Sequence, residues 1–141
     1  MSTLAEMLQG IDLVSPDVVI GGQKDFYQTY VLRHLVEKSN PSIKVITAPI
    51  FRDYDGLAFS SRNKFLTGGE RTRAAYISKE LQKISHWPSY PSVKKIKDYL
   101  NSAVKNARGF YADIDVCSTN TLQELNMINE EAIINVITLF N

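Results

Sequence analysis

The chain has 141 residues, of which 44% are hydrophobic and 22% charged, with a formal net charge of +1. This length and apolar content suit one packed domain or two small ones. The near-neutral balance argues against nucleic acid as a partner, because such binding depends on clustered basic side chains. A single cysteine, Cys117, excludes an intrachain disulfide and a CxxC zinc site, so we expect a reducing, cytoplasmic compartment. The sequence contains neither a membrane-spanning apolar run nor the pattern of a secretory signal, so no membrane partner is expected.

The first part of the chain has the pattern of a βαβ unit. Residues 3–12 show helical apolar spacing, and the apolar run at 17–21 is typical of a strand in a parallel sheet. A helix is predicted over 25–38 and a second strand over 43–48. The apolar stripe expected on that helix consists of Tyr30, Val31, His34 and Leu35. Because His34 falls on this stripe, we interpret it as a structural residue.

The second part predicts two helices and then two strands. Thr67 and Glu70 form a capping box, and the helix that they start runs to about Ile84. Ser92 caps another helix, which ends before Gly109. Strands are expected over 110–117, with Cys117 as a strand-edge thiol, and over 132–140. The side chains expected to share one strand face are Phe110, Ala112, Ile114 and Val116 in the first and Ile133, Ile137 and Leu139 in the second.

These elements predict an α/β fold class with two parts. Residues 1–54 would form a partial Rossmann-like βαβ unit, the C-terminal remnant of a nucleotide-binding domain. Residues 55–141 would form a small α+β domain of two helices and an antiparallel strand pair. Two parallel strands cannot complete a Rossmann-like sheet, so we expect exposed strand edges and either self-association or pairing with another chain.

A first candidate phosphate site follows the first predicted strand. The stretch Gly21-Gly22-Gln23-Lys24-Asp25 joins that strand to the next helix. Glycines and a basic residue between a strand and a helix have the geometry in which α/β folds hold phosphates. The alternative is a solvated Lys24 and an Asp25 that only favours the start of the helix through its dipole.

A second candidate site lies in the loop at 53–63. Two hydroxyls, Ser60 and Ser61, precede the guanidinium of Arg62. Arginine offers a fixed fork of charge-assisted donors and serine supplies short ones, which together suit a row of phosphate oxygens. The alternative is a polar turn before a helix.

Together the two stretches resemble the pantoate–β-alanine ligase family, also called pantothenate synthetase. Its Gly-x-Lys-Asp-x-x-Gln element is matched by Gly22, Lys24, Asp25 and Gln28. Its Asp-Gly-Leu-Ala-x-Ser-Ser-Arg-Asn element is matched by Asp55–Ala58 and Ser60–Asn63, with Phe59 in place of the usual Met or Leu. The resemblance runs from about Ser15 to the C-terminus and covers only the second half of such an enzyme.

The resemblance implies an ATP-dependent, AMP-forming ligase that makes pantothenate from pantoate and β-alanine through a pantoyl adenylate. The catalytic residues implied around the phosphates are Lys24, Ser60, Ser61 and Arg62. The resemblance also implies ribose contact at Asp25, pantoate contact at Gln28, and backbone contacts to ATP at Gly22, Phe51 and Phe59. Asp55-Gly56 would be a hinge that lets the serine–arginine loop close over the site.

The chain departs from the family pattern in lacking the His-x-Gly-His nucleotide motif and the magnesium-binding acids, which the family carries in its N-terminal half. We therefore expect the Mg²⁺ ligands in that other half and no metal ligands in this chain. Three hypotheses remain open: a ligase portion that needs the other half, a module that binds ATP alone, and a non-catalytic interaction protein. A homodimer or other homo-oligomer, or pairing with the missing half, is expected in each case.

Overall fold

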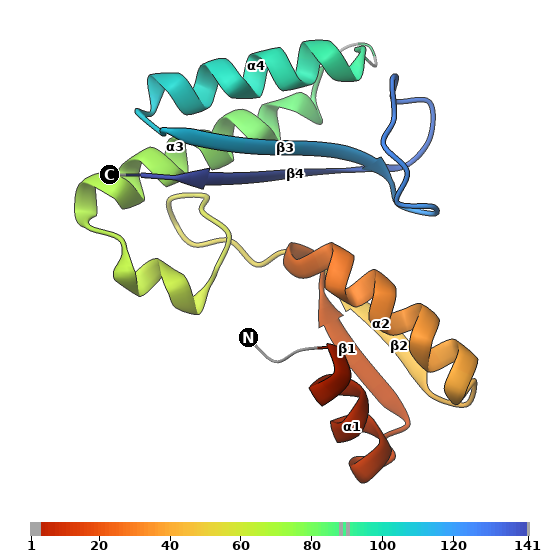
Figure 1. Ribbon diagram of the computed structural model, residues 1–141. Coiled ribbons are helices and arrows are strands. Elements are labelled where there is room, and N and C mark those ends of the chain that lie inside the picture. The colour runs from red at the N-terminus through yellow and green to blue at the C-terminus, as the bar shows by residue number, and fades with distance from the viewer. Residues whose placement is uncertain (1–3, 88, 90, 141) are drawn as a thin grey trace. The chain divides into compact units, whose positions relative to one another are not determined.

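The computed structural model describes residues 4–87, 89 and 91–140 and divides into two compact units, Met1–Phe51 and Arg52–Asn141. The elements of each unit are labelled in Figure 1. The division falls after Phe51 rather than after residue 54, because Arg52 and Asp53 both bond to a helix of the second unit. The mixed α/β class predicted from the sequence is confirmed.

The first unit is built on two parallel strands, β1 (Val18–Gly22) and β2 (Lys44–Ala48). Between them the chain forms a short 3-10 turn, η1 (Gln23–Asp25), and the helix α2 (Phe26–Ser39). The helix α1 (Leu4–Val14) precedes β1. The core of this unit consists of Leu32, Val36 and Ile43, with Leu4, Met7, Leu8, Ile11, Val19 and Val45 packed against them.

The predicted apolar stripe of α2 is wrong. Leu32 and Val36 are each 1% exposed, whereas His34 is exposed and Leu35 is 38% exposed. Both sets fit helical spacing, so periodicity alone cannot choose between them; packing against α1 and the strands does. The His34 ring lies 4.2 Å from the Tyr30 ring, and its Nδ1 is 3.0 Å from the Tyr30 carbonyl oxygen, contacts of a structural residue.

The opposite face of the β1–β2 pair is apolar and open. Val18, Ile20 and Ile46 are 43%, 69% and 38% exposed. They alternate with the covered residues along each strand, as the pleat requires. Parallel strands are normally covered on both faces, so this surface, which we call the open sheet face, has the character of an interface.

Gly21 permits close packing between β1 and α2, and its replacement gives a first prediction. A Cβ at Gly21 would lie 2.5 Å from both Cγ2 and Oγ1 of Thr29, whereas a Cβ at Gly22 meets nothing within 4 Å. We expect Gly21→Ala to lower the free energy of unfolding by about 1–3 kcal/mol, as overpacking does. Gly22→Ala is the matched control and should change it far less. Denaturant unfolding measures both, and equal losses would contradict the prediction.

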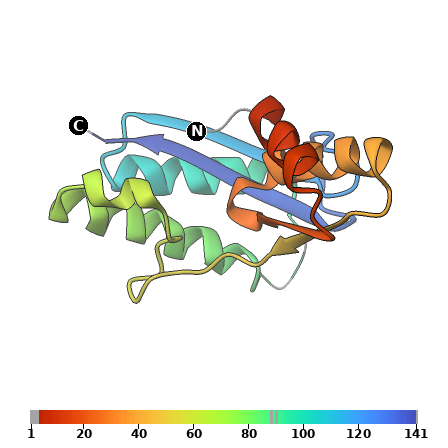
Figure 2. The ribbon, with the colours of Figure 1, turned by 90° about the horizontal axis from the view of Figure 1, so that it is seen from below.

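The second unit packs two helices on one face of an antiparallel strand pair (Figures 1 and 2). The helices are α3 (Gly68–Ile84) and α4 (Val93–Asn106), and the strands are β3 (Tyr111–Ser118) and β4 (Ala132–Leu139). The predicted capping box at the start of α3 is confirmed. The core consists of Ile84, Val93, Ile96, Leu100, Ile114 and Val116, with Ile134 and Val136 of β4 packed against it.

The structure refines three expectations for the strands. Ile133, Ile137 and Leu139 share one side of β4 as predicted, and Ile137 and Leu139 are 50% exposed there, while Ile134 and Val136 on the other side meet the core. Phe110 lies before β3 and is 58% exposed. Cys117, expected as a strand-edge thiol, is the last residue but one of β3 and is only 7% exposed.

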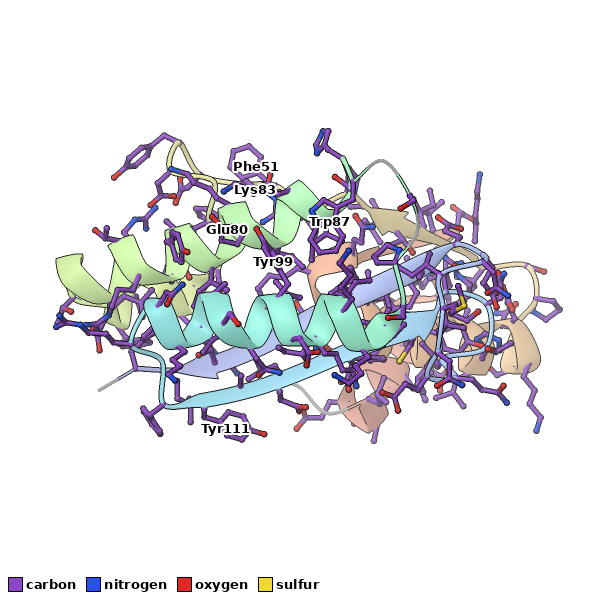
Figure 3. The ribbon with its side chains drawn as sticks, turned by 90° about the horizontal axis from the view of Figure 1, so that it is seen from above. Phe51, Glu80, Lys83, Trp87, Tyr99 and Tyr111 are labelled. Carbon is purple, nitrogen blue, oxygen red and sulfur yellow. The ribbon has the colours of Figure 1, made fainter. Side chains whose placement is uncertain are left out.

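A buried carboxylate, Glu80, links α3 to α4. Glu80 is 8% exposed and accepts hydrogen bonds from Lys83 Nζ at 2.6 Å and from the Tyr99 hydroxyl. Figure 3 shows these three side chains converging from the two helices. The bonds from Lys83 and then Tyr99 lower the pKa of Glu80. The Tyr99 hydroxyl thus links α4 to Glu80 of α3, while Lys83 bonds Glu80 within α3, and a structural role is sufficient for this carboxylate.

Candidate functional site

The first motif lies at the carboxyl end of β1. Lys24 and Asp25 are in η1, where Lys24 Nζ is 3.3 Å from Asp25 Oδ1 and their side chains are 39% and 52% exposed. Asp25 stands at the N-cap of α2, but its side chain makes no capping hydrogen bond. The carboxyl ends of parallel strands are where open α/β sheets receive ligands. The structure therefore presents a cation and a carboxylate together at such an edge.

The remaining predicted residues of the first unit flank this turn. Gly22 ends β1, and its carbonyl accepts the Thr29 hydroxyl at 3.1 Å. Gln28 is half-buried, with Nε2 3.2 Å from the sulfur of Met7 in α1. Phe51, the last residue of the unit, is 71% exposed. Gly22, Lys24, Asp25 and Gln28 thus lie on consecutive turns of one connection.

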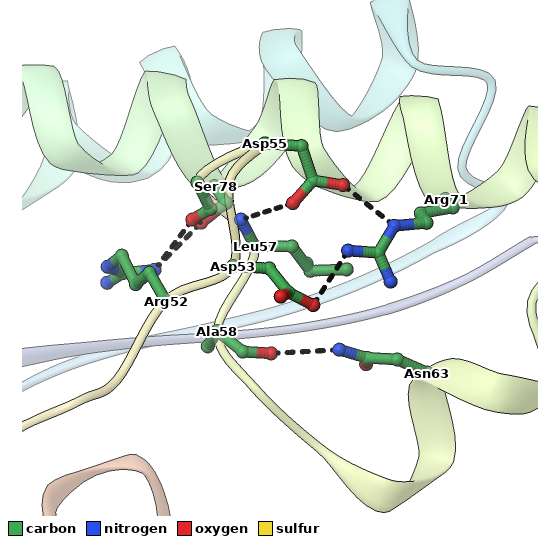
Figure 4. A network of polar contacts seen from close by, with 9 residues as sticks. Arg52, Asp53, Asp55, Leu57, Ala58, Asn63, Arg71 and Ser78 are labelled. Atoms are coloured by element: carbon green, nitrogen blue, oxygen red, sulfur yellow. Dashed lines mark hydrogen bonds and ion pairs between the residues drawn. The ribbon is translucent and has the colours of Figure 1, made fainter.

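The second motif begins as a tight turn and not as an open loop (Figure 4). The Asp53 amide donates to the Leu57 carbonyl at 2.8 Å, and the Gly56 amide donates to the Asp53 carbonyl at 2.8 Å. Arg52 and Ala58 form an antiparallel bridge across the turn. Gly56 has a φ of 86°, in the left-handed region that favours glycine.

The Asp55-Gly56 pair, predicted as a hinge, is bonded to α3 in this conformation. The Gly56 carbonyl accepts the Ser78 hydroxyl at 2.7 Å, and Gln82 Nε2 and Arg52 Nη1 at 3.3 Å each. Arg52 also donates to Ser78 Oγ at 2.8 Å. Three donors on one carbonyl hold this point of the chain.

Arg71 of α3 also binds this turn, through the carboxylates of Asp53 and Asp55. Its Nε donates to Asp55 Oδ2 and its Nη2 to Asp53 Oδ2, each at 2.8 Å. These hydrogen bonds, to Asp53 first and then Asp55, raise the pKa of Arg71. Sequence reasoning missed Arg71; the available signal was a basic residue near a helix N-terminus, where the dipole disfavours positive charge.

The Ser60–Arg62 segment follows as an ordered stretch with exposed donors. Ser60 Oγ accepts the Arg62 amide at 3.3 Å and starts the 3-10 helix η2 (Ser61–Phe65). Asn63 Nδ2 donates to the Ala58 carbonyl at 3.1 Å. Ser61 and Arg62 are exposed, and Phe59 is 60% exposed. The backbone is thus held while the Ser61 and Arg62 side chains face solvent.

The structure places the predicted residues in two groups, one in each unit. Lys24 and Asp25 are in contact in the first unit, and the Ser60–Arg62 segment is continuous in the second. Within residues 4–87, 89 and 91–140, no cluster of three or more His, Cys, Asp or Glu side chains is arranged to hold a metal ion. Over the same residues, no helix is long and apolar enough to cross a membrane.

The carboxylates around this segment predict acid sensitivity. The Thr67 hydroxyl, followed by its amide, lowers the pKa of Glu70. Burial raises the pKa of Asp55, but the Leu57 amide and Arg71 outweigh it and lower the pKa overall. A carboxyl group whose pKa is lower in the folded chain than in the unfolded chain stabilises the fold at pH values above the ordinary carboxyl range. This contribution is lost as the pH falls through the folded pKa, so the free energy of unfolding should decrease below about pH 4.

Denaturant unfolding at a series of pH values tests this acid loss. The Asp55→Asn, Glu70→Gln double variant should be less stable at neutral pH and lose less on acidification. The same acid loss in wild type and variant would contradict the role of these two groups.

Comparison with known proteins identifies the family. A sequence profile described as pantoate-beta-alanine ligase matches residues 5–140. The chain belongs to the pantoate–β-alanine ligase family. The pantothenate synthetase of Bacteroides thetaiotaomicron is 32% identical over 131 residues, which are 92% of this chain and 46% of the relative. That of Wigglesworthia glossinidia brevipalpis is 34% identical over 125 residues, 86% of this chain and 43% of the relative.

Solved structures of the ligase family share the fold. The pantothenate synthetase of Thermus thermophilus matches with a TM-score of 0.82 and 24% identity over 97% of this chain and 50% of that one. The ligase from Francisella tularensis, solved with beta-gamma ATP and beta-alanine, matches with a TM-score of 0.59 and 23% identity over 96% of this chain and 48% of that one. The predicted partial Rossmann-like class is thus confirmed, and the chain spans about half the length of its relatives.

Proposed function

We propose that the chain is the phosphate-binding part of an ATP-dependent, AMP-forming ligase that joins pantoate to β-alanine. The observation that carries the proposal is the Ser60–Arg62 segment, whose backbone is fixed while Ser61 and Arg62 remain exposed. Family membership and the cationic turn at Lys24 support it. The Francisella relative was solved with an ATP species and β-alanine, the ligands that the proposal brings to this chain.

The proposed reaction has two steps and no covalent enzyme intermediate. The pantoate carboxylate attacks the α-phosphorus of ATP and pyrophosphate leaves; the β-alanine amine then attacks the pantoyl carbonyl and AMP leaves. Both steps require positioning and stabilisation of phosphate charge. The donors proposed for this are Lys24, Ser60, Ser61 and Arg62.

The remaining ligand contacts are proposed from the family pattern. Asp25 would bind the ribose hydroxyls and Gln28 the pantoate. Backbone groups of Gly22, Phe51 and Phe59 would contact the rest of the nucleotide. The donor set of this chain suits phosphate oxygens, and the proposal follows the family pattern in assigning the Mg²⁺ ligands to the other half of the ligase.

The open sheet face is the proposed docking surface for that part of the ligase fold. Ile20 and Val18 on β1 and Ile46 on β2 would be buried by it, and the free strand edges would gain partners. The relatives are about twice as long as this chain, and their additional residues are enough to form such a layer. The proposal places the assembled enzyme in a reducing, cytoplasmic setting, which suits a chain with the single cysteine Cys117.

Reconstitution tests the proposal. The partner is the N-terminal part of the Bacteroides thetaiotaomicron relative, the portion that precedes its match to this chain, expressed separately. The mixture should form AMP in a pantoate-dependent reaction, and this chain alone should form none. AMP formation by the chain alone would show that the other part is dispensable, and a stable complex with no turnover would refute the ligase role.

The docking surface has its own matched pair of variants. Ile20→Lys places a charge on the open sheet face and should abolish co-purification with the N-terminal part. Ile137→Lys is the control, because Ile137 is 50% exposed on the strand pair of the second unit. If both variants bound the N-terminal part equally well, the open sheet face would not be the docking surface.

A further inference from the structure

The segment from Arg52 to Arg71 is a closed loop with Ser60, Ser61 and Arg62 in its middle. It starts at the turn over 53–57 and runs through η2 to the capping box at Thr67. Arg71 then reaches back to the carboxylates of Asp53 and Asp55 (Figure 4). The two ends of the loop are therefore joined by one side chain.

The Arg71 contact is directional and not a diffuse surface attraction. Two different nitrogens of one planar guanidinium bond two different carboxylates, an arrangement that a lysine cannot reproduce. The side chains of Arg71, Asp53 and Asp55 are only 25%, 28% and 17% exposed, so water competes weakly for them. The Tyr54 ring lies 5.5 Å from the guanidinium carbon.

The Arg71 side chain is separate from the apolar core that holds α3 in place. The helix is anchored there by buried Ala75, Ile77 and Ile84. The Gly56 carbonyl has its own bond from Ser78. Removing Arg71 should therefore leave α3 folded and release the Asp53 and Asp55 carboxylates, so that the segment after the turn regains part of the freedom that loop closure had removed.

We infer that Arg71 is a positioning residue of the ligase: by holding Asp53 and Asp55 it keeps the Ser60–Arg62 segment in the conformation that receives the ATP phosphates. The inference rests on the proposed function. Two of its nitrogens, Nε and Nη2, are engaged by carboxylates, so the role inferred for Arg71 is to hold the segment and not to bind the nucleotide. Its effect is preorganisation, since donors held in place lose less freedom on binding than donors on a loose loop.

Amide hydrogen exchange on the full chain tests the positioning. In Arg71→Gln, exchange at Gly56 and Asn63, whose amides bond within the segment, should rise about tenfold. Arg71→Lys should give a smaller rise, because it retains one contact. Exchange at Leu100 and Val116 in the core should stay unchanged. Arg73→Gln is the matched control on the same helix, since Arg73 lies over the Phe140 ring at 5.2 Å. Unchanged exchange at Gly56 and Asn63 in Arg71→Gln would overturn the inference.

An ATP titration of the chain in complex with the N-terminal part, followed by the amide resonances of residues 61 and 62, separates the inference from the proposed function. Arg62→Gln and Arg71→Gln should each raise the dissociation constant for ATP about tenfold, with Arg71→Lys between wild type and Arg71→Gln. If only Arg62→Gln raised the dissociation constant for ATP, the phosphate role would be supported and Arg71 would have a structural role alone. Titration curves that do not depend on Arg62 would refute the phosphate role itself, and the inference with it.

Discussion

Arg62→Lys is expected to lower the adenylation rate of the reconstituted ligase by on the order of a hundredfold, nearly as much as Arg62→Ala. Arg62 is exposed at the start of η2, on a backbone that Ser60 and Asn63 hold in place. Lysine keeps the charge but loses the planar pair of donors that fits two phosphate oxygens. Pyrophosphate release in a single turnover measures the rate.

Two controls decide what Arg62 does in that experiment. Lys64→Ala, a change at an exposed cation in the same 3-10 helix, should leave the rate close to that of wild type. Amine attack on a supplied pantoyl adenylate should suffer less in Arg62→Lys, because the pyrophosphate has already left. Equal losses in both half-reactions would mean that Arg62 maintains the segment's structure and does not bind the triphosphate.

Leu100→Ala should produce the largest loss of stability. Leu100 is 0% exposed in α4, where it packs with Ile96 and with Val116 of β3. Truncation removes apolar contacts and leaves a cavity in a core that both helices and both strands share, which costs about 2–5 kcal/mol. That is a large share of the stability of an ordinary domain. Denaturant unfolding of wild type and variant measures the difference.

The matched change for Leu100→Ala is Leu139→Ala. Leu139 is of the same type but 50% exposed on the outer face of β4, so its truncation should cost well under half as much. Comparable losses at the two positions would show that the outer face of the strand pair is covered in solution, and would identify a second interface.

Local patterns determined most of the secondary structure correctly. The capping box at Thr67 and Glu70 needs only four consecutive residues, and it forms as predicted. The apolar runs before Gly21 and around Val45 became β1 and β2, and the order strand, helix, strand predicted their parallel pairing. The two ligase motifs were also readable from the sequence, because their residue types and spacing lie within short stretches, and the family comparison confirmed that resemblance.

Only the tertiary structure decided which face of each element is buried and which motif residues are fixed. On α2 two helical stripes competed, and contact with α1 and the strands selected Leu32 and Val36. At Gly56 the sequence suggested a hinge, and the fold adds a hydrogen bond to its carbonyl from Ser78, 22 residues away. Arg71 reaches Asp55 across 16 residues. Helical periodicity and turn chemistry act over a few residues, whereas hydrogen bonds between distant side chains form only once the fold brings them together.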